Sequence, residues 1–241
     1  AELGVQFEPG DAERLGHYLA LLLEANKTTN LTAIREPAEA WIKHILDALT
    51  LMPALAELEP GARVIDVGSG GGLPGLPLAI VMPHLSFTLL EATGKKADFL
   101  RLAVATLRLP NVTVIADRAE RLGNDRGERA PDGSRIGAHR ESYDAVVARA
   151  VGRLSVLAEL TVPFAKPAGD GKPGGLVLLI KGQKADEELE EATQALHLLK
   201  VVHGATINTP TGRIIVIEKV SATPKMYPRN CLLYTSPSPR D

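Results

Sequence analysis

Hydrophobic residues recur with helical spacing in the first 60 residues. Residues 11–25 carry apolar side chains at positions i, i+4, i+7 and i+8, namely Leu15, Leu19, Leu22 and Leu23. This spacing predicts an amphipathic helix, and the polar residues 26–31 predict a loop after it. Pro37 suits the first position of a second helix, whose apolar positions are Trp41, Ile45, Leu49 and Met52.

The pattern changes after Pro60 and Gly61, where short apolar runs alternate with helical stretches. Strands are predicted at 63–67, 87–91, 112–115, 143–148 and 176–180, and helices between them include 95–107 and 154–164. This alternation predicts βαβ units and a mostly parallel α/β sheet, doubly wound, with both faces covered. After a helix at 185–199, two runs at 201–207 and 213–218 flank a turn-rich segment. They predict an antiparallel hairpin at one sheet edge.

Two stretches carry little that a core could bury. Residues 123–141 are rich in Gly, Arg, Asp and Glu, and residues 167–175 are rich in Pro and Gly. We assign no regular structure to either. The chain therefore divides into an N-terminal helical extension, 1–60, and an α/β domain, 61–229.

Charge and composition narrow the function classes. The 27 basic and 29 acidic residues give a net charge of −2, but residues 1–60 are acidic overall and the rest is weakly basic. Charge alone favours an ordinary solvated surface, although phosphate binding needs only a local basic face. A lone Cys231 cannot form an internal disulfide, and no apolar run approaches the roughly 18–20 residues of a membrane span. We therefore expect a cytoplasmic globular protein.

A glycine-rich loop carries the clearest chemical signal. An apolar strand ends at Asp66 and runs into Gly68, Gly70 and Gly72, after which Pro74 begins a helix. Glycine is needed where φ is positive and where the backbone must approach a ligand closely. The helix N-terminus offers free N–H groups to a ligand anion, and the doubly wound fold places ligands at this end of the sheet.

Two cofactor classes compete for this loop. The string from Gly70 to Gly75 reads G-x-G-x-x-G, which is the weak signature of a dinucleotide. We prefer S-adenosylmethionine, because an acid at the strand end followed by Gly-x-Gly-x-Gly suits its amino-acid end, whose carboxylate can meet loop N–H groups. Glu91 stands at the end of the next strand and can accept both ribose hydroxyls of either cofactor.

With this loop, the chain closely resembles the ribosomal RNA small subunit methyltransferase G family, also called glucose-inhibited division protein B. The matching segments are 30–32, 44–49, 66–78, 90–96, 118–120, 148–151, 181–182 and 227–229. The strings Glu-Ala-Thr-Gly-Lys-Lys and His-Ile-Leu-Asp are specific to this family. The resemblance implies a Rossmann-like class I methyltransferase that uses S-adenosylmethionine. Its implied reaction is methylation of a guanosine N7 in 16S rRNA of the small ribosomal subunit.

The resemblance also assigns residues. The family's cofactor positions map onto Gly68, Leu73, Ala119, Glu120 and Arg149, which join Gly70, Gly72 and Glu91 in the predicted cofactor site. The segment 230–241 departs from the Gly/Pro/Lys-rich tail of the family. We expect this tail to be atypical and foreign to the protein, and we exclude it from the fold.

Methylation of guanine N7, the reaction that the resemblance implies, needs no general acid or base. N7 carries a free lone pair, so the enzyme contributes mainly positioning and electrostatics. No cysteine nucleophile exists outside the excluded tail. Arg149 follows a strand end on the ligand side, and we take it as the candidate catalytic residue, contacting cofactor or target base. Arg153 is the neighbouring candidate for a phosphate.

Other basic residues are candidate RNA contacts. Lys95 and Lys96 stand in the first turn of a helix, where the dipole disfavours cations, which hints at an anionic partner such as the rRNA backbone. Arg229 closes the family match and is a further candidate. His44 and Asp47 lie at i, i+3 on one helix face, where spacing alone favours a structural pair.

Three further expectations bound the function. The remaining histidines lack metal-ligand spacing, so no metal is predicted, and no oligomer is predicted. A nicotinamide-dependent oxidoreductase is the rival enzyme, although 60 N-terminal residues are too few for its substrate domain. A ribosome-binding factor that has lost activity is the third hypothesis.

Overall fold

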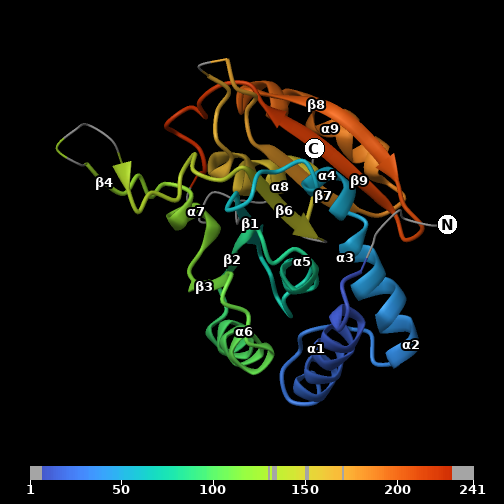
Figure 1. The fold of residues 1–241 in the computed structure, drawn as a ribbon. Coiled ribbons are helices and arrows are strands. Elements are labelled where there is room, and N and C mark those ends of the chain that lie inside the picture. Colours follow the sequence, from blue (N-terminus) through green and yellow to red (C-terminus); the bar gives the residue numbers. More distant parts are fainter. Residues whose placement is uncertain (1–6, 130, 132–134, 150–151, 170, 230–241) are drawn as a thin grey trace.

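The computed structural model describes residues 7–129, 131, 135–149, 152–169 and 171–229. Within these ranges the main sheet has seven strands in the order β3-β2-β1-β6-β7-β9-β8 (Figure 1). The strands are β1 (Arg63–Val67), β2 (Ser86–Glu91), β3 (Val112–Ala116), β6 (Ala145–Arg149), β7 (Leu176–Lys181), β8 (Val201–Asn208) and β9 (Arg213–Lys219). The first five run parallel, and β9 lies antiparallel to both β7 and β8. The predicted doubly wound sheet with its C-terminal hairpin is confirmed.

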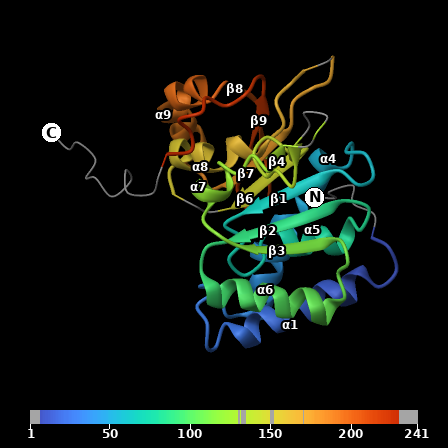
Figure 2. The same ribbon diagram turned by 90° about the vertical axis from the view of Figure 1, so that its left-hand side faces the viewer.

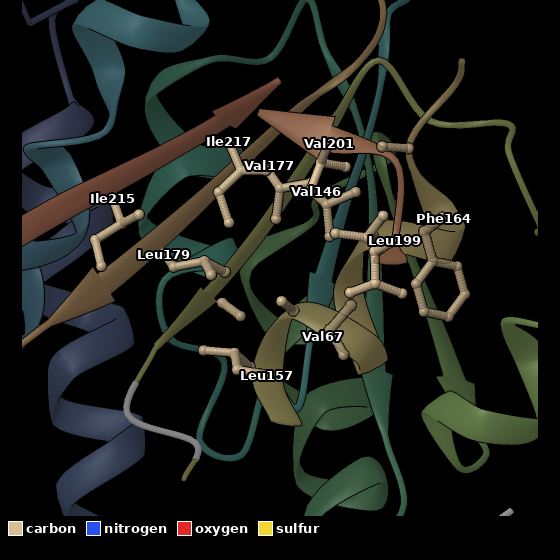
Figure 3. Packing of buried hydrophobic residues seen from close by; sticks show 14 of the residues in the cluster. Val67, Val146, Leu157, Phe164, Val177, Leu179, Leu199, Val201, Ile215 and Ile217 are labelled. Carbon is tan, nitrogen blue, oxygen red and sulfur yellow. The ribbon is translucent and has the colours of Figure 1, made fainter. Parts of the chain in front are cut away.

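Helices cover both faces of this sheet. In Figures 1 and 2, α1 and α6 lie on one side and α8 and α9 on the other. The first side holds α1 (Asp11–Ala25), α5 (Gly75–Val81) and α6 (Gly94–Leu107); the second holds α7 (Ala119–Leu122), α8 (Leu154–Thr161) with its 3₁₀ turn (Val162–Phe164), and α9 (Ala185–Leu198). Neighbouring residues of one strand pack to opposite sides: Val146 joins the α8–α9 core of Figure 3, and Val147 joins the core on the other face.

The N-terminal helices share their core with the sheet. Leu15, Tyr18 and Leu22 of α1 pack in one buried cluster with Leu76 of α5 and Leu100 of α6. The boundary predicted at residue 60 therefore divides the sequence, while the packing is continuous across it.

The second predicted helix is not a regular α-helix. It consists of α2 (Pro37–Ala40), a π-helical segment η1 (Trp41–Leu46), α3 (Asp47–Leu49) and, after a turn, α4 (Met52–Leu55). Pro37 is its first residue, as predicted. The π-helical segment buries His44 and Ile45 and leaves Trp41 and Ile42 exposed. Single π-helical turns are rare and often stand at functional sites.

The two stretches without predicted structure differ from each other. Residues 123–141, to which the sequence alone assigns no regular structure, contain a short antiparallel ribbon, β4 (Glu128–Arg129) and β5 (Arg135–Ile136). Residues 167–175 form only an isolated bridge, in the part described. The tail 230–241, with Cys231, lies outside the described residues. No helix in the described ranges is both long and apolar enough to cross a membrane.

Candidate active site

The predicted site residues meet at the carboxyl edge of the sheet. The chain builds from β1 outward through β2 and β3 on one side, and from β6 through β7 on the other. The strand order therefore reverses between the paired strands β1 and β6, and the carboxyl ends at this switch point are where doubly wound folds bind ligands. Gly68 follows β1, Glu91 ends β2 and Arg149 ends β6, so the topology brings all three to this edge.

The loop after β1 is joined to Glu91 by a charged hydrogen bond. The Gly70 N–H donates to Glu91 Oε2 at 2.9 Å, and the Thr93 N–H donates to Oε1 at 2.8 Å. Each carboxylate oxygen still has a second lone-pair direction. Gly70 has a φ of +55°, and a Cβ there would meet no atom closer than 3.9 Å. Open space therefore lies beside a held carboxylate, which fits the ribose of a cofactor.

Gly72 and Leu73 have a different environment. Gly72 has a φ of +94°, and a Cβ there would lie 2.4 Å from Leu76 Cδ1, so only glycine fits without displacing this side chain. The Leu73 side chain is buried in the cluster that contains α1. Both residues serve packing, and their predicted cofactor contacts stay predictions that involve the main chain.

Five loop N–H groups that we expected to offer to a ligand carboxylate are already engaged. The N–H groups of Gly68 and Ser69 donate to the Leu90 carbonyl. Those of Gly72 and Leu73 donate to the Ser69 carbonyl, and that of Gly75 donates to Asp66 Oδ2. The expectation therefore does not hold for them, because their acceptors are the Leu90 carbonyl of β2, the Ser69 carbonyl of the loop and Asp66. A ligand carboxylate must find donors other than these five.

Asp66 is an unusual buried acid at the end of β1. It is fully buried, Oδ2 accepts from the Gly75 N–H at 3.0 Å, and Oδ1 has no partner among the described residues. Burial raises the pKa of Asp66 to about 7, although the Gly75 N–H and the Arg149 charge both lower it. The carboxyl group therefore titrates near neutral pH.

Sequence reasoning missed the contact between α1 and the loop. The Tyr18 hydroxyl is fully buried and donates to the Gly71 carbonyl at 2.8 Å. A Cβ on Gly71 would lie 2.7 Å from Leu22 Cδ1, so α1 packs directly on the loop. The sequence offers one sign of this contact: Tyr18 lies three residues after Leu15, on the same apolar face of the predicted helix.

Ala119 and Glu120 begin α7, directly after β3. The register sets Ala116 of β3 opposite Glu91, so α7 starts near this carboxylate. Both residues are half-buried. The N–H groups of a first helical turn have no partner inside the helix, so they can read the polar edge of a base.

Arg149 is held by the second helical segment. Its Nη1 donates to the Lys43 carbonyl at 2.9 Å and to Asp47 Oδ2 at 3.2 Å, and lies 3.3 Å from His44 Nδ1. The other Asp47 oxygen accepts the hydroxyl of Thr211, in the turn between β8 and β9. His44 and Asp47 therefore meet on Arg149, whereas spacing alone had favoured a pair between the two of them.

A cavity of about 580 Å³ opens beside Arg149. This volume lies within the range of about 300–1,000 Å³ typical of small-molecule sites. Its walls combine apolar side chains with a few polar ones: Thr32, Ile34, Ile42, His44, Asp47, Ile180, Lys181, Glu188 and Thr211 are among them. Lys181 is buried and pairs with Glu188 at 2.7 Å.

Three of the four candidate RNA contacts follow strand ends of the same edge. Lys95 is exposed and Lys96 half-buried in the first turn of α6, which follows β2. Arg153 is exposed and caps α8, which follows β6. Arg229 instead pairs with buried Glu159 of α8 at 2.6 Å. RNA binding by all four stays a prediction. Within the described ranges, no group of three His, Cys, Asp or Glu could hold a metal ion.

Comparison with known proteins identifies the family. A family model described as rRNA small subunit methyltransferase G (GidB) matches residues 11–213. A relative from Sorangium cellulosum, named ribosomal RNA small subunit methyltransferase G, is 50% identical over 95% of this chain and 88% of its own length. One of the same name from Moorella thermoacetica is 37% identical over 95% of this chain and 90% of its own.

A solved structure supports the fold. A SAM-dependent methyltransferase from Aquifex aeolicus matches with a TM-score of 0.54 at 15% identity, covering 83% of this chain and 98% of that one. The likeness confirms the Rossmann-like fold. Given the family match over most of its length, this chain belongs to the rRNA small subunit methyltransferase G family and is a methyltransferase.

Proposed function

We propose that this protein transfers a methyl group from S-adenosylmethionine to N7 of a guanosine in 16S rRNA of the small ribosomal subunit, in the cytoplasm. Membership of the family supports an rRNA methyltransferase activity that uses S-adenosylmethionine, and it implies guanosine N7 as the target. One structural relationship carries the proposal: open space at Gly70 beside Glu91, and a cavity beside Arg149, share one edge of the sheet.

The cofactor site is built from held acceptors and helix-start donors. S-adenosylmethionine, when bound, supplies a methyl group on a positively charged sulfur. Glu91 is already fixed by the Gly70 and Thr93 N–H groups, and its remaining lone pairs accept the two ribose hydroxyls. The N–H groups of Ala119 and Glu120 meet the adenine edge. Gly68 and Leu73 contribute main-chain contacts.

Arg149 supplies the charge that the loop does not. Because five loop N–H groups are engaged, the methionine carboxylate needs another donor. A guanidinium has five N–H groups, and the contacts of Arg149 to Lys43, His44 and Asp47 use its two terminal nitrogens only. Its Nε–H therefore remains for a carboxylate or a base oxygen. Arg149 thus links the cofactor site to the cavity.

The cavity beside Arg149 receives the target nucleoside. Guanine N7 has an in-plane lone pair, so no side chain has to remove a proton before attack. The protein orients the base, excludes water and fixes the charges around the reacting atoms. Lys95, Lys96, Arg153 and Arg229 are the proposed contacts to the RNA backbone.

Methyl transfer tests the proposal directly. Assembled 30S subunits and naked 16S rRNA are incubated with the protein and labelled S-adenosylmethionine, and nucleosides are analysed by mass spectrometry. We expect 7-methylguanosine in 16S rRNA. Cofactor binding without transfer to either substrate would favour the inactive ribosome-binding factor. Calorimetric binding of a nicotinamide dinucleotide in place of S-adenosylmethionine would favour the oxidoreductase.

A further inference from the structure

Three distant chain segments converge on the guanidinium of Arg149. Its partners come from the π-helical segment, from α3 and, through Asp47, from the β8–β9 turn. His44 is at the centre of this convergence: its Nδ1 lies 3.3 Å from both Nη1 and Nη2 of Arg149. On the opposite side of the ring, Nε2 lies 2.7 Å from Thr32 Oγ1.

The hydrogen-bond donors fix where the His44 proton is. A guanidinium only donates, and Nη1 uses its two hydrogens on the Lys43 carbonyl and Asp47, so a hydrogen bond from Nη2 requires a lone pair on His44 Nδ1. The ring proton is therefore on Nε2 and is donated to Thr32 Oγ1. The Lys43 carbonyl, 3.1 Å from Nδ1, takes its hydrogen from Arg149 Nη1 instead, at 2.9 Å. The Nε2–H tautomer of neutral His44 thus satisfies the contacts to Arg149 and Thr32, and leaves the Lys43 carbonyl to Arg149.

The acceptor of this proton is itself fixed. Thr32 Oγ1 also accepts the Ile34 N–H at 3.1 Å, so the loop before the second helical segment holds the hydroxyl in place. The polarity of the chain then runs in one direction, from Arg149 to His44 to Thr32. A chain of donors with a single polarity holds its first member in one orientation.

Asp47 supplies the opposite charge. One carboxylate oxygen accepts from Arg149 Nη1, and the other accepts from the Thr211 hydroxyl. The Asp47 and Arg149 side chains are 8% and 16% exposed, so solvent screens this pair little. Asp47 therefore balances the charge of Arg149 while His44 sets the plane of its guanidinium.

We propose that His44 and Asp47 are positioning residues of the methyltransferase: they hold the Arg149 guanidinium beside the cavity, with His44 acting through Nδ1 as a neutral acceptor. The inference rests on the proposed function in one respect, which is that Arg149 contacts the reacting groups. The alternative is that both residues contribute to stability only. The two possibilities predict different coupling to Arg149.

A double-mutant cycle separates them. His44→Ala, Arg149→Ala and the double variant are compared for kcat, for the KM with assembled 30S subunits as substrate, and for the S-adenosylmethionine Kd. We expect His44→Ala to lower kcat/KM about 10- to 100-fold in the wild-type background. In the Arg149→Ala background the same change should cost less than about twofold. Equal losses in both backgrounds would overturn the proposal.

Matched variants exclude a loss through misfolding. His44→Asn keeps an acceptor near the position of Nδ1, so it should recover most of the activity that His44→Ala loses. His84→Asn is the control, because His84 is an exposed residue of the loop before β2, at the opposite edge of the sheet. Asp47→Asn should lower kcat/KM in the wild-type background and not with Arg149→Ala. Failure of His44→Asn to recover activity, with its unfolding midpoint unchanged, would also count against the proposal.

A spectroscopic measurement determines the tautomer of His44 without an activity assay. Nitrogen-15 NMR of the histidine rings, assigned with His44→Asn, reports which nitrogen carries the proton. We expect the Nε2–H tautomer for His44 at neutral pH, and a changed Nδ1 shift in Arg149→Ala. A proton on Nδ1 would overturn the proposal. If the wild type does not methylate rRNA, the proposed function fails, and this measurement still tests the contact between His44 and Arg149.

Discussion

The main-chain N–H of Gly70 and the carboxylate of Glu91 are 2.9 Å apart, and this contact joins the loop after β1 to the end of β2. Glu91 is 7% exposed and accepts a second N–H from Thr93. The carboxylate is therefore oriented before any ligand arrives, which reduces the entropy that binding would otherwise cost.

Glu91→Gln should weaken cofactor binding. The amide keeps the shape but replaces one acceptor oxygen by a donor, which then opposes either an N–H group or a ribose hydroxyl. Hydrogen bonds to a charged group contribute about 1.5–3 kcal/mol, so we expect the Kd for S-adenosylmethionine to rise about 10- to 100-fold by calorimetry. Glu190→Gln, at an exposed position of α9, is the matched control. Unchanged affinity in Glu91→Gln would remove this residue from the cofactor site.

Asp66 should make the protein less stable as pH rises from about 4 to 7. The pKa of Asp66 is about 7 in the folded protein against 3.8 in the unfolded chain, because the carboxyl group is buried. Between these values the folded state keeps a proton that the unfolded state has released. The free energy of unfolding then falls by about 1.4 kcal/mol per pH unit, and levels off above pH 7.

Asp66→Asn isolates this contribution. The neutral side chain cannot ionise, so the decline of stability with pH should be shallower in the variant by the equivalent of one proton. Urea unfolding at several pH values from 4 to 8 measures both proteins. Parallel curves for the variant and the wild type would show that Asp66 is ionised normally in the fold.

Tyr18→Phe should loosen the glycine loop. The change removes the hydroxyl that donates to the Gly71 carbonyl and leaves this carbonyl buried without its partner. We expect a loss of about 1–3 kcal/mol in the free energy of unfolding and weaker S-adenosylmethionine binding. His17→Ala, at the neighbouring exposed position, should change neither quantity. An unchanged Kd with reduced stability would confine the role of Tyr18 to the core.

Arg140→Leu should detach the segment that precedes residue 230. Arg140 is buried, and its terminal nitrogens donate to four carbonyls, those of Gly123, Thr223, Pro224 and Tyr227. Loss of these charged hydrogen bonds should cost at least about 3 kcal/mol of unfolding free energy.

Proteolysis and a surface control complete this test. Limited proteolysis of Arg140→Leu should cleave within 220–229 faster than in the wild type. Arg121→Ala, which removes the ion pair between exposed Arg121 and Asp117, should leave the unfolding midpoint nearly unchanged. A similar small change for Arg140→Leu would mean that the four contacts are not maintained in solution.

The candidate RNA contacts should be visible in salt dependence. Each phosphate contact contributes about 0.7–0.9 to the slope of log K against log salt concentration. Lys95→Gln, Lys96→Gln and Arg153→Gln should each weaken 30S binding and reduce this slope by about that amount. Lys27→Gln, whose ammonium pairs with Glu24 on the exposed side of α1, is the control. If a variant keeps the wild-type slope, the residue that was substituted makes no phosphate contact.

The sheet and its helices could be predicted because local pattern and burial agree. Strands such as β1 are buried on both faces, so their continuous apolar runs identify them. The π-helical form of residues 41–46 could not be predicted. The periodicity from Pro37 to Met52 is that of an ordinary helix, and it carries no sign of the wider turn, within which His44 contacts distant Arg149.

The sequence predicted those parts of the candidate site whose residues lie at or just after the end of a strand. Glu91, Ala119, Glu120 and Arg149 lie at the carboxyl edge because parallel strands bring their ends together. Tyr18 and Thr211 escaped prediction because their partners, Gly71 and Asp47, lie far away in the sequence. Thr32 lies only 12 positions from His44, but this contact depends on how the loop folds back on the helical segment. The sequence also did not predict that the loop N–H groups bond to the Leu90 and Ser69 carbonyls, because these bonds depend on how tightly the loop folds.

The bond between Asp47 and Thr211 spans 164 positions of the chain. During synthesis, the helical segment that carries Asp47 leaves the exit tunnel long before the β8–β9 turn is made. Asp47 therefore gains this partner only after the β8–β9 turn has been synthesised. A nascent chain can complete the electrostatic arrangement around Arg149 only once Thr211 has emerged, and a translation product truncated before Thr211 lacks it.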